Sequence, residues 1–473
     1  MQFNFKTIFQ SFKNKEMLKR IFTIFGIIVA YRLLAHIPVP IGDSSTFRDV
    51  IHNSVQNTDL GNFLNMISGG GLTNFAIILV GLSPFITSSI VFQLLGKAVP
   101  SMEELNRDGE VGRRKIAQWT RIATVPLAIL QSIAYIFILY QTAGATSPGA
   151  VNPSTSELVL SVTAMTAGSI ILMWMGELIT EQGVGSGISM IIFASIVSSF
   201  PNTMGALFSD LFDTTNGKLS VFGWFDLPVN PNTLLLAVSM LVGVVIVLYW
   251  IVKLNESQRI ITINYAKRVH GNSAYGGIKA QMPIKMIAAG VIPVIFAVAF
   301  LSVPSFIGQI MKSADPTNQV ANNLVDWFSA PSAANFTELT PTWFVYPICY
   351  FILVMVFTYF YTTVVFNAKE IAENLQKQGG FIEGVRPGIT TEKYFNKLIN
   401  RLNLFGALSL GLIAMIPYIV DYIFIVITGR PLGLSISGTG LLIVVTVALE
   451  NLRQLNSRAL MVTYDDFQYE PQN

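Results

Sequence analysis

The chain has 473 residues, of which 52% are hydrophobic and only 12% are Asp, Glu, Lys or Arg, with a formal net charge of +3. A soluble domain carries roughly 25% charged residues, so this composition excludes an ordinary soluble globular protein. A helix that crosses the hydrocarbon core needs about 20 mostly apolar residues, and runs of this kind recur along the whole chain.

Ten membrane spans are predicted, and they leave no room for a large soluble domain. In chain order they cover residues 21–39, 73–96, 122–140, 158–176, 187–208, 232–252, 286–306, 343–366, 402–421 and 435–452. The first span follows a basic stretch, but it is too long for a signal peptide and no small-residue cleavage site follows it. We therefore expect a retained first span and an all-α polytopic membrane protein.

The distribution of Lys and Arg between alternate loops predicts the orientation. One set of loops and termini, which includes both ends of the chain, holds 25 of these residues, and the opposite set holds 4. Short loops rich in Lys and Arg stay in the cytoplasm. Both termini are therefore predicted to be cytoplasmic, and the asymmetry supports an even number of spans.

No catalytic, metal or cofactor site is indicated. The single cysteine, Cys349, excludes an internal disulfide and a cysteine-based metal cluster. The histidines His36, His52 and His270 are scattered, and no Gly-Lys-Ser/Thr follows the three glycines at 69–71, as a phosphate-binding loop requires. We expect no enzymatic activity.

The interiors of the spans are almost free of ionisable residues. Pumps and ion-coupled carriers usually place such groups near the midplane of the membrane. Arg32 can extend its side chain to an interface, and Glu177 and Asp421 lie at the ends of spans. This pattern argues against an ion-coupled carrier but leaves a carrier of neutral solutes open.

Several spans contain helix-breaking residues. Pro84, Pro293 and Pro417 lie inside predicted spans, where a proline removes a backbone hydrogen bond and kinks the helix. Simple bending tolerated by the neighbouring helices and a moving gate both fit these kinks.

Two pairs of aliphatic residues lie near the helix-breaking positions or in the fifth span. Leu82 and Ile86 are four residues apart, as are Ile188 and Ile192, so each pair shares a helix face. Such pairs usually pack against other helices or face lipid. A pore narrowed by bulky aliphatic side chains requires the same pairs.

Two basic cytoplasmic loops, 253–285 and 367–401, are long and rich in distinct sequence. In the second loop Ile371 and Leu375 share a helix face, and Gly379-Gly380 is a plausible helix stop. "KYFNKLINRLNLF" then predicts a helix that leads into the ninth span, so we expect a helical hairpin with Arg386 near its tip. An exposed arginine suits contact with carboxylate or phosphate, and an acidic protein and RNA both remain possible partners.

Distinctive segments occur in order across nearly all ten spans. They include "YRLLAHIPVP", "SGGGLTNFAIILVGLSPFITSSIVFQLL", "EELNRDGEVGRRKIAQWTR", "MWMGELITEQGVGSGISMIIFASIVSSFP", "NYAKR", "MPIKMIAAGVIPVIFA", "FTYFYTTVVFNAKEIAENLQKQGGFIEGVRPG" and "TGLLIVVTVALE". With these segments the chain closely resembles the SecY family, the channel-forming subunits of the bacterial Sec protein translocase.

The resemblance implies a fold of ten transmembrane helices in two inverted five-helix halves, residues 1–208 and 209–473, around a central pore. A short re-entrant plug at about residues 61–72 precedes the second span. The implied plug residues are Phe63, Leu64, Met66, Ile67, Gly69, Gly70 and Gly71. The glycines would join the plug to its span flexibly.

The resemblance also implies three further groups of site residues. The pore ring consists of Leu82, Ile86, Ile188, Ile192, Ile295 and Ile443. The lateral gate lies between the second and seventh spans and includes Pro84, Thr87, Pro293 and Val303. Docking of cytoplasmic partners involves Arg259, Lys267, Arg268, Lys377 and Arg386.

A protein-conducting channel is the implied function. The family passes signal sequences and nascent polypeptides across the bacterial plasma membrane or into the lipid bilayer. It works with the SecE and SecG subunits, and it draws energy from the SecA ATPase or the translating ribosome. Ile260 and Glu383 depart from the family pattern at the loops that dock these partners. A membrane insertase without a through-pore and a carrier of neutral solutes are the alternatives.

Overall fold

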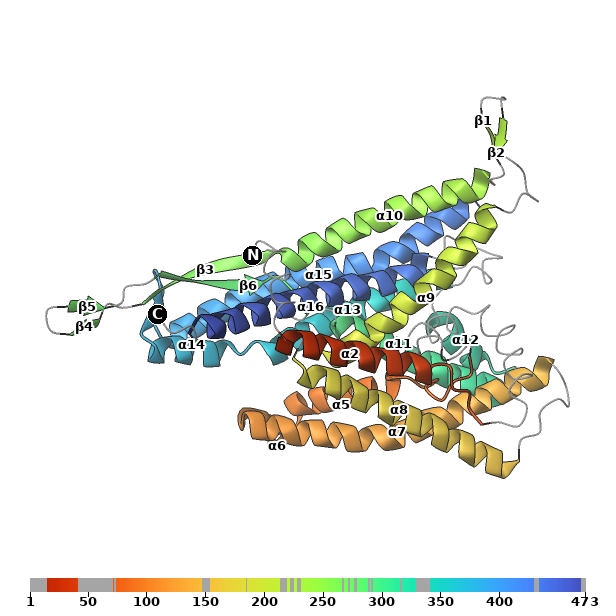
Figure 1. The fold of residues 1–473 in the computed structure, drawn as a ribbon, viewed down its shortest axis with the longest axis horizontal. Helices are drawn as coiled ribbons and strands as arrows, with labels where there is room; N and C mark the ends of the chain where they lie inside the picture. The colour runs from red at the N-terminus through yellow and green to blue at the C-terminus, as the bar shows by residue number, and fades with distance from the viewer. Residues whose placement is uncertain are drawn as a thin grey trace.

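The computed structural model describes residues 15–40, 71, 74–146, 154–183, 185–212, 219–221, 225–227, 231–265, 268–270, 273–275, 279–287, 290, 292–314, 317–328, 341–428 and 434–468. The chain is mainly α-helical, and its long helices lie roughly along one direction (Figure 1). In the first part of the chain they are α2 (Lys15–Leu34), α5 (Ser83–Ala98), α6 (Pro100–Arg107), α7 (Glu110–Thr146), α8 (Thr155–Glu181) and α9 (Gly187–Leu211).

The second part of the chain adds a further set of helices. They are α10 (Pro231–Glu256), α11 (Ile292–Ala314), α12 (Gln319–Phe328), α13 (Val345–Val365), α14 (Ala368–Lys377), α15 (Ile389–Thr428) and α16 (Leu434–Gln468), with a 3₁₀ turn at Pro341–Phe344. Each of the ten predicted spans overlaps one helix. Within the described ranges, six helices are long and apolar enough to cross a membrane, namely α7, α8, α10, α11, α13 and α15. The polytopic helical class is confirmed, while the count of ten stays a prediction.

Helices pack side by side within each part of the chain. The two parts contact each other at two places. The helices α5, α7 and α8 lie on one side of the molecule, and α10, α13, α15 and α16 lie on the other (Figure 1). The two sets meet where α9 contacts α10 and α16, and where α11 contacts α5 and α7. The largest hydrophobic cluster contains buried residues from both sets, so the core of the protein lies between them.

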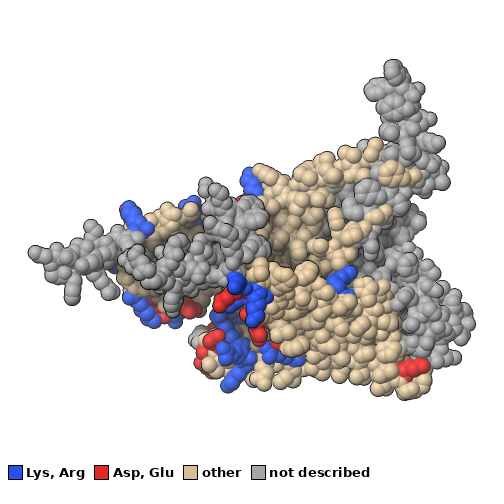
Figure 2. All heavy atoms as spheres, viewed as in Figure 1, with Lys and Arg blue, Asp and Glu red and all other residues tan. Residues whose placement is uncertain are grey.

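The body of the molecule presents an apolar surface. Figure 2 shows charged side chains gathered at the end near α6 and the strands, while the helical body is almost free of them. Large exposed hydrophobic residues cover α2 and α10, including Phe22, Phe25, Leu241 and Val245. A surface of this kind is stable against lipid tails and not against water, which agrees with the membrane-protein class.

The prolines of the second and seventh spans do not kink helices, and this prediction was wrong. Pro84 is the second residue of α5, and Pro293 is the second residue of α11. The first turn of a helix tolerates proline, because a backbone N–H has no partner inside the helix there. Each helix follows a glycine with positive φ, Gly81 at 63° and Gly290 at 64°, which ends the preceding segment. Pro417, in contrast, lies inside α15 as predicted.

The two long loops form a small sheet that the sequence did not indicate. Strands β3 (Gln258–Tyr265), β6 (Lys279–Lys285) and β7 (Gly380–Ile382) lie in the order β6-β3-β7, and both pairings are antiparallel. Two further pairs are β1 (Leu219–Val221) with β2 (Phe225–Leu227), and β4 (Arg268–His270) with β5 (Ser273–Tyr275). The three-stranded sheet extends beyond the ends of the helices (Figure 1).

The predicted helical hairpin at 367–401 is therefore only partly right. The α14 helix begins after Asn367, whose side chain accepts from the N–H of Glu370, and Gly379 follows its end with a φ of 73°. The chain then enters β7 rather than a second helix directly. The α15 helix begins at Ile389 and continues through the predicted "KYFNKLINRLNLF" into the ninth span.

Candidate pore ring and gate helices

The six predicted ring residues meet in one hydrophobic cluster. Leu82 at the start of α5, Ile86 in the same helix and Ile192 of α9 are buried. Ile443 of α16 is also buried. The partly buried Ile188 of α9 and Ile295 of α11 pack against this cluster. All six predicted ring residues therefore belong to one cluster, which also contains buried residues of α2, α8, α10, α13 and α15.

The two predicted gate helices are in direct contact. The α5 helix packs against α11, which also contacts α7. Pro84 and Pro293 are buried, and the hydroxyl of Thr87 donates to the main-chain oxygen of Ser83 at 2.9 Å. Val303 lies at the surface, with 42% of its area exposed. Of the four predicted gate residues, the two prolines therefore lie in the interior and Val303 lies at the surface.

The segment before α5 is non-helical and firmly held. The N–H of Val39 donates to the oxygen of Phe75 at 2.8 Å, and the N–H of Ile77 donates to the oxygen of Ile37 at 2.9 Å. From α8, the Ser169 hydroxyl donates to the oxygen of Gly81 at 2.8 Å. These bonds fix the position at which α5 begins and therefore the position of Leu82.

Sequence reasoning missed the contribution of α8 to this site. Gly168 lies so close to the main-chain oxygen of Ile77 that a Cβ at this position would overlap it. The neighbouring Ser169 supplies the bond to Gly81. A Gly-Ser pair inside an apolar span is the available signal, because small residues allow close approach in membranes. The partner segment, however, could not be found from the pattern alone.

The predicted plug lies outside the described residues, apart from Gly71. The oxygen of Gly71 accepts from the N–H of Ala76 at 2.8 Å, and Gly71 is buried. This contact connects the end of the predicted plug to the segment that holds α5.

The predicted docking residues that the structure describes lie in the two long loops, on different elements. Arg259 of β3, Lys377 of α14 and Arg386 in the turn after β7 are exposed. Arg268 belongs to β4, and Lys267 lies outside the described residues. The pairing of β3 with β7 brings the two loops together, although they are more than a hundred residues apart.

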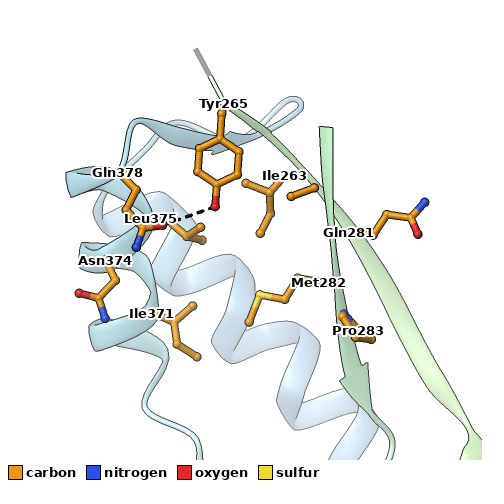
Figure 3. A pocket seen from close by; sticks show the side chains of 10 residues that line it. Ile263, Tyr265, Gln281, Met282, Pro283, Ile371, Asn374, Leu375 and Gln378 are labelled. Atoms are coloured by element: carbon orange, nitrogen blue, oxygen red, sulfur yellow. Dashed lines mark hydrogen bonds between the residues drawn. The ribbon is translucent and has the colours of Figure 1, made fainter. Parts of the chain in front are cut away.

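A cavity of about 370 Å³ lies between α14 and the sheet. Figure 3 shows that Ile263, Met282, Ile371 and Leu375 converge on it, whereas Gln281 and Asn374 point away. The Tyr265 hydroxyl donates to Gln378 Oε1 at 3.5 Å on one side of this cavity (Figure 3). Leu375 is buried and Ile371 is partly buried, which confirms the helix face predicted from their spacing.

Charged groups gather where β6 approaches α16. Desolvation by burial, together with the neighbouring positive charge of Arg453, lowers the pKa of the Lys285 ammonium. The Glu450 carboxylate acts in the opposite direction. A carboxylate and two cations therefore lie near each other at this end of the helices. On the neighbouring helices, Arg121 Nε of α7 pairs with Glu177 Oε1 of α8 at 2.5 Å.

The long apolar helices, with a hydrophobic cluster between the two parts of the chain, define a class, the polytopic helical membrane proteins. Comparison with known proteins then gives the family. The family model described as SecY matches residues 76–452. The chain belongs to the SecY family.

Relatives and solved structures agree with this assignment. The chain is 36% identical to the protein translocase subunit SecY of Streptomyces coelicolor, over 97% of this chain and 98% of that protein. It is 34% identical to the protein of the same name from Thermotoga maritima, with the same shares covered. A solved protein-conducting channel superposes with a TM-score of 0.63, at 19% identity, over 92% of this chain and 91% of that one.

A more distant structure has the same fold. Sec61 from a canine ribosome–channel complex superposes with a TM-score of 0.59, at 18% identity, and the match covers 92% of this chain and 91% of that one. At this identity the likeness concerns the fold alone.

Proposed function

We propose that this chain is the protein-conducting channel of a Sec translocase. It passes unfolded secretory polypeptides across the membrane and releases transmembrane segments sideways into lipid. The observation that supports the proposal is that all six implied ring residues, from α5, α9, α11 and α16, belong to one hydrophobic cluster between the two parts of the chain. That the transported molecules are polypeptides is inferred from the family to which the chain belongs.

The aliphatic ring suits a channel for polypeptides of any sequence. Leu, Ile and Val side chains offer no fixed hydrogen bonds, so a chain that slides past them meets no sequence-specific trap. A narrow apolar constriction also excludes ions at rest, because water leaves it and a bare ion cannot enter. One set of residues, Leu82, Ile86, Ile188, Ile192, Ile295 and Ile443, therefore serves both as seal and as passage.

Lateral release is proposed to occur between α5 and α11, near Thr87 and Val303. A hydrophobic segment that enters this seam gains about 25 cal/mol for each Å² of apolar surface that leaves water, so it partitions into lipid. A polar segment gains nothing there and continues through the ring. The plug at 61–72 is proposed to cover the far side of the ring in the resting state.

Partners are proposed from the family and from the exposed cations. SecE and SecG are the expected membrane partners, and SecA or the translating ribosome is expected to dock where Arg259, Lys377 and Arg386 are exposed. The chain is assigned no catalytic step of its own. We place it in the bacterial plasma membrane with both termini in the cytoplasm, since 25 of its 30 Lys and Arg residues fall on that side in the predicted topology.

Reconstitution tests the proposed function. The chain would be purified with its SecE partner, placed in planar bilayers, and compared with a chain lacking residues 61–72, while proteoliposomes with SecA and ATP receive a secretory polypeptide. We expect protease-protected polypeptide in the vesicles and ion-passing openings mainly after the deletion. Absence of protected polypeptide together with silent bilayers for both chains would contradict a channel and favour an insertase or a carrier of neutral solutes.

A further inference from the structure

The α16 helix continues beyond the ring residue Ile443 with polar side chains that contact other helices. Asn255 Nδ2 of α10 donates to Thr446 Oγ1 at 3.3 Å. Arg453 Nη2 donates to the main-chain oxygen of Asn255 at 2.7 Å. Both bonds join α16 to α10, and both helices belong to the second part of the chain.

Asn451 differs from these residues because it contacts the first part of the chain. Its side chain is buried, with 8% exposed, and its Nδ2 donates to the sulfur of Met190 in α9 at 3.1 Å. Its Oδ1 lies on Gly185, in the turn between α8 and α9, so closely that a Cβ on Gly185 would overlap it. The Asn451 side chain of α16 thus packs against a turn in the first part of the chain.

The turn that receives Asn451 is itself held by hydrogen bonds. Gly183 has a φ of 69°, and the N–H of Gly187 donates to the Thr180 hydroxyl at 2.9 Å. From α2, Arg20 Nη1 donates to the main-chain oxygen of Gln182 at 3.2 Å. Because these contacts hold the turn in place, a shift of Asn451 relative to the turn moves α16 relative to α9.

Both helices that this contact joins also carry predicted ring residues. Met190 falls between the ring residues Ile188 and Ile192 of α9, and Asn451 follows Ile443 by eight residues in α16. Eight residues of α-helix rise about 12 Å, so Asn451 lies roughly two turns from the ring along α16. The separation of α9 and α16 near the ring is therefore set in part by how deeply Asn451 sits against Gly185.

We propose that Asn451 is a positioning residue for the pore ring, which holds α16 against the α8–α9 turn and keeps the resting channel sealed. The inference rests on the proposed channel function. If the halves separate, the amide loses its partner in a buried place and Gly185 loses its close contact, so the contact favours the closed arrangement. Loss of one such contact is expected to raise the population of open channels about tenfold.

Two substitutions reach the same contact from opposite sides. Asn451→Ala removes the amide, and Gly185→Ala inserts a methyl group where Asn451 Oδ1 lies. The control is Thr446→Val, which removes a buried hydrogen bond of the same helix at nearly constant volume, but toward α10 of the same half. The double variant Asn451→Ala/Gly185→Ala has room for the new methyl group, so its effects should not add.

Ion efflux from vesicles that contain the full chain and its membrane partner is the readout, with thermal unfolding measured in parallel. We expect about tenfold faster resting efflux for Asn451→Ala and for Gly185→Ala, no further increase in the double variant, and wild-type efflux for Thr446→Val. Efflux at the Thr446→Val level in Asn451→Ala would overturn the proposal, whatever happens to the unfolding temperature. If Gly185→Ala fails to fold, Asn451→Ala alone decides the question.

Translocation of a secretory polypeptide into the same vesicles separates this proposal from the proposed function. If the wild-type chain translocates the polypeptide and the ion efflux is unchanged in Asn451→Ala, the proposed role of Asn451 is refuted and the proposed channel function stands. Wild-type chain that translocates nothing contradicts the channel function, while the efflux comparison still reports whether Asn451 holds α9 and α16 together.

Discussion

Gly168 has no side chain, and this allows α8 to pack closely against the segment that precedes α5. Its position leaves no room for a Cβ beside the main-chain oxygen of Ile77, and that segment leads directly to Leu82. Gly168→Ala forces α8 away from this segment, and overpacking of this kind costs about 1–3 kcal/mol. We expect a lower unfolding temperature for the purified chain in detergent.

Gly26→Ala is the matched control for this substitution. Gly26 lies in α2, and nothing is found within 4 Å of the place where its Cβ would be. Alanine in an open helical position stabilises by roughly 0.5–1 kcal/mol relative to glycine. If Gly168→Ala and Gly26→Ala had the same unfolding temperature, the close contact with Ile77 would not affect the stability of the folded chain.

At the residue level, the sequence predicted a ring, which stays a prediction, and it did not predict the contacts that position α5 and α16. The spacing of Leu82 and Ile86 places both on one helix face, and only the family resemblance added Ile295 and Ile443. The contacts of Ser169 with Gly81 and of Asn451 with Met190 join segments that are 88 and 261 residues apart. No local pattern encodes such a contact, because it exists only when the helices have packed.

At the scale of elements, hydropathy located the helices and misjudged where two of them begin. A window of apolar residues does not distinguish helix from a non-helical apolar segment held by neighbours, such as residues 74–82. The Gly-x-x-Pro pattern, which occurs at Gly81–Pro84 and at Gly290–Pro293, could have indicated where these two helices begin. A glycine with positive φ followed by a proline marks a helix start rather than a kink.

The sheet that joins the two loops gives an element-scale prediction. Asn264 of β3 lies opposite Phe381 of β7 in the antiparallel register. Directly opposed positions are close enough for a disulfide, whereas a position two residues away is beyond its usual reach. In a chain with Cys349→Ala, we therefore expect Asn264→Cys/Phe381→Cys to form a disulfide on mild oxidation, detected by proteolysis between the loops and gel mobility.

The control pair keeps one partner and shifts the other out of register. Thr262→Cys/Phe381→Cys should stay reduced under the same conditions, because Thr262 lies opposite Gln281 of β6 and not opposite Phe381. Equal oxidation of both pairs would mean that the loops meet without a defined register. This sheet was not predicted from the sequence, because β7 is only three residues long and its partner β3 lies more than a hundred residues earlier in the chain.

At the scale of the whole molecule, the two parts of the chain are joined by contacts of different kinds. Toward α5 and α7, the contacts of α11 include the tilted ring pair of Phe306 with Tyr135 of α7, whose centroids lie 5.2 Å apart. Toward α16, the α9 helix receives the buried amide of Asn451. Removing the partner of a buried polar group costs about 1–3 kcal/mol, so the contact between α9 and α16 resists separation of the two parts.

The most direct test of the central claim is to find a translocating polypeptide inside the ring. A photo-reactive amino acid would replace each of the six ring residues in turn, and a secretory polypeptide would be stalled during SecA-driven translocation by a folded domain at its C-terminal end. Val245 of α10, which is exposed on the apolar surface, is the control position. The account predicts cross-links to the stalled polypeptide from ring positions on α5, α9, α11 and α16 and none from Val245. Cross-links that are missing from the ring while the polypeptide still crosses the membrane would contradict it.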